Sequence, residues 1–552
     1  MKTPGAEACL PSLSIALVSS AALGYEILLM RLFSIVQWHH FAYMIISLAL
    51  LGYGASGTFI ALTRHVLLAH FNRAYWFNLA LFGVSAVACF AAAQQIPFNP
   101  EEILWDWRQH LRLLAIYLLL ALPFFFAANA IALALTRDPV KVARLYAADL
   151  LGAGLGSLGI VLLLFLVLPG KALLGLGALG LAAAGLAARE LHMPHHRWQI
   201  MALLGAILML ALPDQWLTLQ ISPYKELSQT LRIPGTQVIA QRSSPLGMLN
   251  IVESSSNPLR HAPGLSLHAT DPIPAQLGLF SDAGGMTAIN HNPQGRPLNY
   301  LEQLTSALPY HLATPARVLL VGTGGGAGVQ QALNHRVAQI DAVELNPQVI
   351  ELVREDFAAW SGQLYARNGV RIVNADARGF IKRSRQRYDL IQLGQADAVG
   401  ATGAGLYSLN ENYLYTVEAL QDYLAHLAPG GYLAASQWIR LPPRDTLKLF
   451  ATAVSALELA AIDSPGRHLA LIRGWQTSTL LVKNGRFTPG EISELQAFCA
   501  ARAFDVAWYP GMQETEANRF NILREPYFYR AASALTGEDA ATFISHYKFD
   551  IT

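Results

Sequence analysis

Seven long apolar runs fill the first 216 residues and constrain what this chain can fold into. They lie near residues 10–33, 41–62, 74–96, 112–136, 145–168, 171–188 and 198–213, and no comparable run follows Pro213. A membrane-spanning helix needs roughly 20 mostly apolar residues to cross the hydrocarbon layer. We therefore predict an α-helical transmembrane bundle of about seven helices over residues 1–216, with the last two helices the shortest.

The composition also points to a lipid bilayer as the partner of this region. Of the 552 residues, 53% are hydrophobic and 14% are charged, whereas about a quarter of the residues of a soluble domain are charged. The net charge of +2 offers no electrostatic basis for nucleic-acid binding, so no nucleic-acid partner is expected.

Small and ionisable residues within the runs suggest how the bundle is built. Gly152, Gly154, Gly156 and Gly159 fall on one predicted helix, and small residues allow membrane helices to approach closely. Glu26, Arg31 and Asp149 are costly inside a membrane, so they are functional candidates, although an intrahelical ion pair is the simpler interpretation.

Loop charges and cofactor supply give opposite expectations for orientation. Basic residues occupy alternate loops, at Arg64 and Arg73, at Arg137, Lys141 and Arg144, and at Arg189 and Arg197. The positive-inside rule places these loops and the N-terminus in the cytoplasm, and seven spans would then put the remainder outside. Because an intracellular cofactor is expected for that remainder, we predict a cytoplasmic C-terminal domain despite the charge pattern.

A glycine-rich loop marks the start of a nucleotide-binding core. Val318–Val321 predicts a buried parallel strand, and Gly322, Gly324 and Gly326 follow it before a helix that begins near Val329. Glycines in this position allow a tight turn and a close approach of the backbone to a ligand.

Two acidic residues follow at the ends of the next predicted strands. Glu344 ends the strand 339–343 and can accept hydrogen bonds from the ribose hydroxyls of a nucleoside, or can simply favour the helix start at Asn346 and Pro347. Asp376, followed by Ala377, ends the strand 370–373 and can accept from an adenine amine or cap a helix. Further strands at 388–393 and 432–438 complete a βαβαβ rhythm, which predicts a doubly wound Rossmann-like sheet.

These motifs together resemble the spermidine synthase family, within the S-adenosylmethionine-dependent methyltransferase fold. The resemblance rests on the run 318–328 with its glycines, on Asp341–Glu344, on Asp376–Phe380, on Arg387–Ile391, and on Tyr300 with Glu302 ahead of the core. It implies four regions: the bundle 1–216, a small β-rich substrate subdomain 217–300, a Rossmann-like domain 301–485, and a C-terminal α/β extension 486–552. Truncation of a longer protein remains an open alternative.

The sequence also departs from the family pattern at three positions. Gly394 stands where the family has the acid that positions and deprotonates the attacking amine, Gly325 replaces an acid of the glycine loop, and Leu301 replaces a histidine. The remaining catalytic candidates are Asp397, Glu411 and Tyr407, and the substrate candidates are Tyr300, Glu302, Asp282 and Tyr413. Asp282 also fits an ordinary turn.

The resemblance implies S-adenosylmethionine or its decarboxylated form as co-substrate and no metal. His268, His291 and His335 show no metal-ligand spacing, and neither do Cys9, Cys89 and Cys499. The expected function is transfer of an aminopropyl or other alkyl group to a small amine or amphipathic acceptor. Two alternatives stay open: a methyltransferase for a lipid-like acceptor, and a non-catalytic transporter or sensor that binds an adenosyl ligand.

The membrane-fused arrangement resembles a bacterial group of multi-spanning, spermidine synthase-like proteins. That resemblance implies a multi-pass protein of the bacterial inner membrane. Assembly into a homo-oligomer is a further open expectation.

Overall fold

The computed structural model describes residues 10–37, 42–137, 139–194, 196–394 and 413–551. The chain divides into two compact units, one formed mainly by residues 1–229 and the other mainly by the residues after 248. Each unit is described by itself below.

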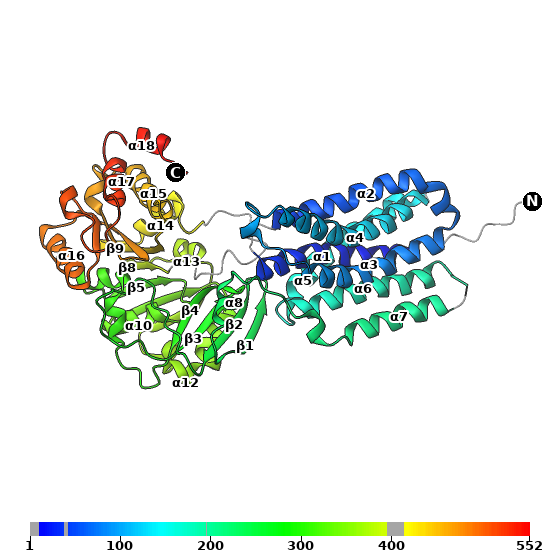
Figure 1. The fold of residues 1–552 in the computed structure, drawn as a ribbon, viewed down its shortest axis with the longest axis horizontal. Helices are drawn as coiled ribbons and strands as arrows, with labels where there is room; N and C mark the ends of the chain where they lie inside the picture. The colour runs from blue at the N-terminus through cyan, green and yellow to red at the C-terminus, as the bar shows by residue number, and fades with distance from the viewer. Residues whose placement is uncertain (1–9, 38–41, 138, 195, 395–412, 552) are drawn as a thin grey trace, which may run out of the picture. The chain divides into compact units, whose positions relative to one another are not determined.

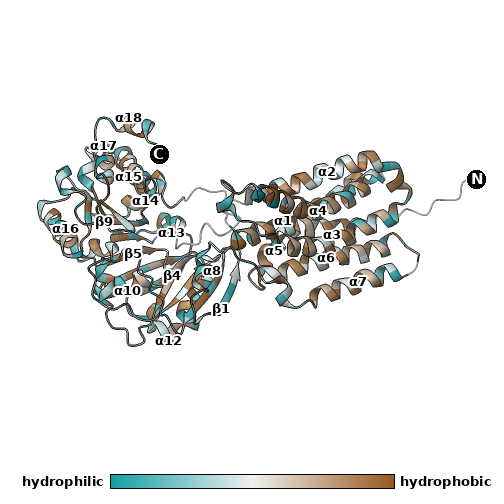
Figure 2. Ribbon diagram, in the orientation of Figure 1, coloured by the Kyte–Doolittle hydropathy of each residue, from teal (hydrophilic) through white to brown (hydrophobic). Residues whose placement is uncertain are grey.

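The first unit is a bundle of apolar helices, as the apolar runs predict (Figure 1). Six of its helices are long and apolar enough to cross a membrane. They are α1 (Ser12–Val36), α2 (Ala42–Ala69), α3 (Phe71–Gln94), α4 (Arg108–Arg137), α5 (Val142–Leu163) and α6 (Pro169–Glu190). Hydrophobic residues dominate these helices along their length, whereas the second unit alternates between hydrophobic and hydrophilic segments (Figure 2).

The seventh apolar run differs from the prediction. It forms α7 (Arg197–Leu210), a helix of 14 residues, which at 1.5 Å per residue extends about 21 Å and is short for a 30 Å hydrocarbon core. It packs along α6 in the opposite direction: Leu203 contacts Gly185, and Met209 contacts Gly177. The short turn η4 (Asp214–Leu217) continues the path, and Leu217 reaches Gly170 at the start of α6.

The chain therefore leaves the bundle at the end opposite to the start of α1. The amide of Ser222 donates to the carbonyl of Val36 at 2.8 Å, at the end of α1. The amide of Gln220 donates to Oε1 of Gln94, the last residue of α3, at 2.9 Å. The basic loops lie at the other end, where the carboxylate of Glu190 accepts from the amides of Leu13 and Ser14 at the start of α1.

Glycines set the closest helix contact of the bundle. A Cβ on Gly152 would lie 2.1 Å from the carbonyl oxygen of Ala16, and one on Gly156 would lie 2.1 Å from that of Ser20. Only glycine permits this approach of α5 to α1. A Cβ on Gly154 would meet no atom within 4 Å from outside the helix, so one face of α5 packs against α1 and the other does not. Asp149 accepts a hydrogen bond from the Ser19 hydroxyl, and Arg31 donates to Ser34 Oγ at 2.9 Å.

The second unit begins with a small β-sheet, which confirms the predicted β-rich subdomain. Its strands lie in sequence order, and the pairings of β2 with β3 and of β3 with β4 are antiparallel. The strands are β1 (Thr236–Ser244), β2 (Gly247–Ser254), β3 (Gln276–Ser281) and β4 (Gly284–Asn290).

A sheet of eight strands forms the core of the second unit. Its order is β12-β10-β11-β9-β8-β5-β6-β7, and the members are β5 (Arg317–Val321), β6 (Gln339–Glu344), β7 (Val370–Asn374), β8 (Tyr388–Leu393), β9 (Leu427–Trp438), β10 (Leu469–Arg473), β11 (Thr477–Lys483) and β12 (Asp505–Trp508). Five neighbouring strands pair in parallel, in the order β9, β8, β5, β6 and β7. The pairings of β9 with β11, of β11 with β10 and of β10 with β12 are antiparallel. The order reverses between β5 and β8, where ligands bind in folds of this kind.

Helices surround the sheet and complete two buried layers of apolar side chains. They include α9 (Leu308–Leu312), α10 (Ala327–Asn334), α13 (Ala377–Arg383), α14 (Val417–Ala425), α15 (Asp445–Leu459), α16 (Pro489–Arg502), α17 (Tyr527–Leu535) and α18 (Ala540–His546). The short helix α8 (Glu226–Thr230) precedes β1 in the sequence. The strand β12 comes from the C-terminal extension and pairs with β10, so the extension enlarges the Rossmann-like sheet.

Candidate adenosyl-binding site

The glycine loop has the backbone geometry that its sequence predicts. Gly322, Gly324 and Gly326 have φ angles of 76°, 48° and 90°. Residues other than glycine adopt these positive values only with strain. Gly326 is the N-cap of α10, so the loop joins the end of β5 to the start of this helix. The loop thus presents backbone amides at the switch point between β5 and β8.

Two departures from the family pattern have a packing cause. A Cβ on Gly325 would lie 2.0 Å from the carbonyl oxygen of Ala288 in β4, so the small sheet leaves no room for an acid there. A Cβ on Gly394 would lie 2.9 Å from the carbonyl oxygen of Gly322 and 3.1 Å from that of Val321. An acid at position 394 would therefore require the ends of β5 and β8 to separate.

Glu344 is anchored against the glycine loop. Its side chain is 7% exposed, and Oε2 accepts from the amides of Thr323 at 3.0 Å and Gly324 at 3.4 Å. Oε1 accepts from the amide of Asn346 at 3.0 Å. The Thr323 hydroxyl also donates to Oε2, at 3.3 Å, so Oε2 has three donors and Oε1 has one. A carboxylate has about four lone-pair positions, two on each oxygen, so Oε1 is the oxygen with capacity for a hydroxyl donor of a ligand.

Asp376 performs the structural role that its position suggested and also contacts a predicted substrate residue. It is the N-cap of α13, where Oδ1 accepts from the amide of Gly379 at 2.7 Å. Oδ2 accepts from the hydroxyl of Tyr413 at 2.6 Å. Ala377 is buried as the first residue of the helix. The structure thus brings Tyr413 to the acidic end of β7.

A second tyrosine marks the position of the missing acid. The hydroxyl of Tyr415 donates to the carbonyl oxygen of Gly394 at 3.1 Å, and the amide of Gly394 donates to Val321 at 2.9 Å. Nothing in the spacing of Tyr415 along the sequence connects it to Gly394, so only the structure identifies this contact. Asp397, Tyr407 and Glu411, the predicted catalytic residues, lie outside the described residues.

Tyr300 lies in a buried polar network beside the loop. Its hydroxyl donates to Oδ1 of Asn290 at 3.0 Å, and Nδ2 of Asn290 donates to Oε1 of Gln330 at 2.6 Å. Burial raises the pKa of Tyr300 to about 12. Gln330 belongs to α10, so this network joins the small sheet, Tyr300 and the helix that follows the glycine loop.

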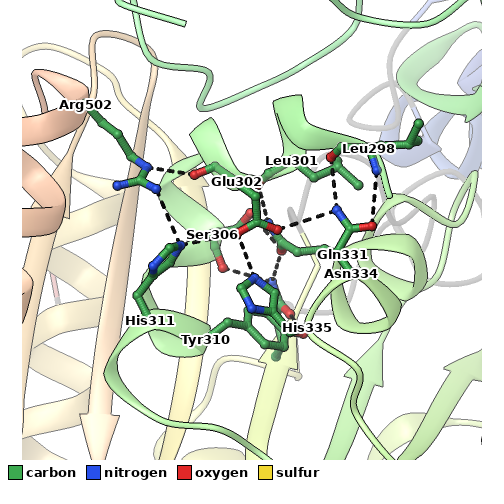
Figure 3. A network of polar contacts seen from close by, with 11 residues as sticks. Leu298, Leu301, Glu302, Ser306, Tyr310, His311, Gln331, Asn334, His335 and Arg502 are labelled. Atoms are coloured by element: carbon green, nitrogen blue, oxygen red, sulfur yellow. Dashed lines mark hydrogen bonds and ion pairs between the residues drawn. The ribbon is translucent and has the colours of Figure 1, made fainter. Parts of the chain in front are cut away.

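Two other predicted substrate residues have different surroundings. Asp282 is buried and occupies the turn between β3 and β4 with a φ of 48°, which agrees with the turn interpretation. The Glu302 carboxylate faces His311 and His335, with Nε2 to Oε2 distances of 3.3 and 2.8 Å (Figure 3). Burial opposes ionisation of Glu302, but the two imidazoles and the amide of Asn334 hold its pKa at about 2.

Comparison with known proteins defines the class of this domain. The sequence profile of the family described as "Spermine/spermidine synthase domain" matches residues 299–431, which include the glycine loop, Glu344, Asp376 and Gly394. Residues 299–431 of the chain are therefore similar to a spermine/spermidine synthase domain, and an apolar helical bundle precedes them in the sequence.

Individual relatives are distant. The polyamine aminopropyltransferase of Sulfolobus acidocaldarius is 26% identical over 160 residues, which are 29% of this chain and 50% of that protein. Polyamine aminopropyltransferase 2 of Hyperthermus butylicus is 27% identical over 133 residues, which are 24% and 41% of the two chains. The chain thus spans about half the length, or less, of these curated relatives.

Solved structures of spermidine synthases align with part of this chain. That of Thermotoga maritima aligns with a TM-score of 0.33 and 16% identity, covering 56% of this chain and 86% of the other. A probable spermidine synthase of Corynebacterium glutamicum aligns with a TM-score of 0.35 and 15% identity, covering 55% and 96%.

Proposed function

We propose that this chain is a membrane-bound transferase that moves an aminopropyl or other alkyl group from an adenosyl sulfonium to an amine or amphipathic acceptor. The observation that carries the proposal is the anchoring of Glu344 by the amides of the glycine loop. This arrangement fixes a carboxylate where the ribose of an adenosyl donor would lie in a doubly wound fold. The spermidine synthase domain match supports the same reaction class.

The leaving group of this reaction needs no acid catalyst, because it departs as a neutral thioether. The acceptor nitrogen attacks the carbon bound to the positively charged sulfur, a C–N bond forms as the C–S bond breaks, and the electron pair leaves with a neutral thioether. An ammonium product must then lose a proton, for which we propose Asp397, with Glu411 and Tyr407 as neighbouring candidates. The main task of the protein is to hold donor and acceptor in line.

The packing around Gly394 supports methyl transfer to a lipid-like acceptor as the second candidate. Since a Cβ at this position would meet two carbonyl oxygens, the usual amine-positioning acid has no place here. A methyl acceptor that is neutral needs no such acid, and the apolar helices offer access to membrane lipids. The same loss of an acid also supports a non-catalytic, ligand-binding role.

Calorimetric titration of the detergent-purified chain distinguishes these candidates. S-adenosylmethionine, its decarboxylated form and methylthioadenosine are titrated against the wild type, Glu344→Gln and the control Glu355→Gln, whose side chain is exposed. We expect Glu344→Gln to bind the preferred donor at least about tenfold more weakly, because one good charge-assisted hydrogen bond accounts for such a factor. Preference for the decarboxylated donor supports aminopropyl transfer, and preference for intact S-adenosylmethionine supports methyl transfer. Binding of neither ligand contradicts the proposal.

We further propose an orientation in which the basic loops face the cytoplasm. The positive-inside rule supports it, and so does the return of the chain along α6 to the end away from those loops. The second unit would then follow on the opposite side, contrary to the cytoplasmic location expected from donor supply. The two arrangements demand different routes for the donor, so the orientation has a test of its own below.

A further inference from the structure

The side chains of Glu302, His311 and His335 meet at one point beside α10, although their spacing in the sequence matches no metal-binding motif. Glu302 comes from the turn η5 (Asn299–Gln303), His311 from α9, and His335 is the C-cap of α10. One ligand atom from each lies within 4.8 Å of the other two. The three side chains are 20–27% exposed, so the point where they meet is partly buried (Figure 3).

The distances suit a small metal ion as well as a set of hydrogen bonds. Bonds of about 2.0–2.1 Å in a tetrahedral zinc site put neighbouring ligand atoms roughly 3.3 Å apart. The Oε2 of Glu302 lies 3.3 Å from Nε2 of His311 and 2.8 Å from Nε2 of His335. Among the described residues, the buried Nε2 of His335 has no hydrogen-bond partner despite that short distance. The nitrogen and the carboxylate oxygen are nevertheless close enough to be ligands of one shared cation.

Neighbouring groups hold the three side chains in place. The ring of His335 stacks on Tyr310 with centroids 4.7 Å apart and 12° between the planes. Nδ2 of Asn334 donates to the second oxygen of Glu302 at 3.5 Å. Contacts of this kind orient ligands in known metal sites. The site also lies at the C-terminus of α10, whose partial negative charge favours a cation.

Arg502 is a cation already present beside these residues. Its Nε donates to the backbone carbonyl of Glu302 at 2.7 Å, and its Nη2 lies 3.5 Å from Nε2 of His311. The backbone contact is compatible with a metal, whereas the Nη2 group must turn away when His311 becomes a ligand. Arg502 thus weakens metal binding without excluding it.

We propose that Glu302, His311 and His335 bind one divalent transition-metal ion of the zinc class, with water as the fourth ligand. Two histidines and one carboxylate are a common ligand set for zinc and related ions. The site is separate from the adenosyl-binding loop, because α10 begins at that loop and its eight residues rise by about 12 Å. Its function is to join η5, α9 and α10, and the inference does not depend on the reaction that the domain catalyses.

Cobalt titration of the full chain tests the proposal. The affinity tag is removed, the protein is stripped with a chelator, and Co²⁺ binding is followed by its visible absorption, with Zn²⁺ as competitor. We expect one saturable site with the intense spectrum of four-coordinate cobalt. His335→Gln and His311→Gln should bind more than about tenfold more weakly, whereas His268→Gln, which changes an exposed histidine, should match the wild type. Arg502→Gln should bind as tightly as the wild type or more tightly.

Further readouts keep the test decisive if a variant folds poorly. Circular dichroism establishes which metal-free variants are folded, and proton release during titration of the wild type reports displacement of imidazole protons. Absence of saturable binding, equal affinity of wild type and His335→Gln, or a weak six-coordinate spectrum would each overturn the proposal and leave a hydrogen-bonded cluster only.

Discussion

At the scale of single residues, Gly394 illustrates how packing determines which chemistry the site can hold. The amide of Gly394 is bonded to Val321, its carbonyl is bonded to Tyr415, and its Cα faces the carbonyl oxygens of the glycine loop. Position 394 therefore serves as a structural contact between β5 and β8, where relatives of this fold can place an acid.

This contact predicts the effect of enlarging Gly394. Gly394→Ala should lower the stability of the domain by about 1–3 kcal/mol, because the new methyl group must displace backbone. The matched control is Gly490→Ala in α16, where a Cβ meets nothing within 4 Å. Thermal unfolding followed by circular dichroism measures both, and equal melting temperatures would refute the packing argument.

A partly buried histidine, His261, makes the stability of the domain depend on pH. Burial lowers the pKa of His261 to about 4 from an unfolded value of 6.5. Below pH 6.5 the unfolded chain therefore binds a proton that the folded chain excludes, so stability should fall between about pH 6.5 and 4, by up to about 3 kcal/mol. His261→Gln should remove this part of the pH dependence of the melting temperature, and His268→Gln should retain it. An unchanged slope in His261→Gln would show that other groups cause it.

At the scale of elements, the pairing of α1 with α5 depends on which face of α5 each glycine occupies. Gly152 and Gly156 face carbonyl oxygens of α1, whereas Gly154 faces open space. The sequence contains all of them in a single cluster, and only the rotation of the helix separates their roles.

Substitution should therefore have opposite effects at neighbouring glycines. Gly156→Ala should destabilise the bundle by about 1–3 kcal/mol or more, because its Cβ would lie 2.1 Å from the Ser20 carbonyl. Gly154→Ala should be neutral or stabilising by up to about 1 kcal/mol, since alanine favours a helix. Melting temperatures in detergent test the pair, and a destabilising Gly154→Ala would mean that another surface covers this face.

At the scale of the whole molecule, the path of the chain through the bundle connects topology with loop charge. Six helices are long enough to cross a bilayer, and α7 with η4 returns the chain along α6. The basic loops and the start of α1 occupy one end of the bundle, and residues 220–222 occupy the other.

This path predicts opposite labelling of the two ends. Single cysteines introduced by His70→Cys and Glu494→Cys, in a chain with its own three cysteines replaced, should react with an impermeant maleimide from opposite sides of the membrane. We expect His70→Cys to be labelled only in inside-out vesicles, since basic loops favour the cytoplasm. Labelling of both positions from the same side would mean that α7 does not complete a crossing. It would also support the cytoplasmic location expected from donor supply.

The sequence by itself determined the features that depend on local pattern. Apolar runs of sufficient length imply the long helices, because an unpaired backbone is not tolerated in lipid. The glycines at 322, 324 and 326 imply a left-handed loop after β5, and the periodic strands imply the parallel sheet. In each case the structure is caused by residues that lie within the sequence pattern itself or a few positions from it.

Only the tertiary structure decided features that depend on contacts between distant segments. The approach of β4 to Gly325, the bonds of Tyr413 to Asp376 and of Tyr415 to Gly394, and the meeting of Glu302 with His311 and His335 have no counterpart in spacing. The packing of α7 along α6 was not predicted either, since run length does not reveal where a helix packs. These properties arise when separate elements dock, and no local pattern encodes that docking.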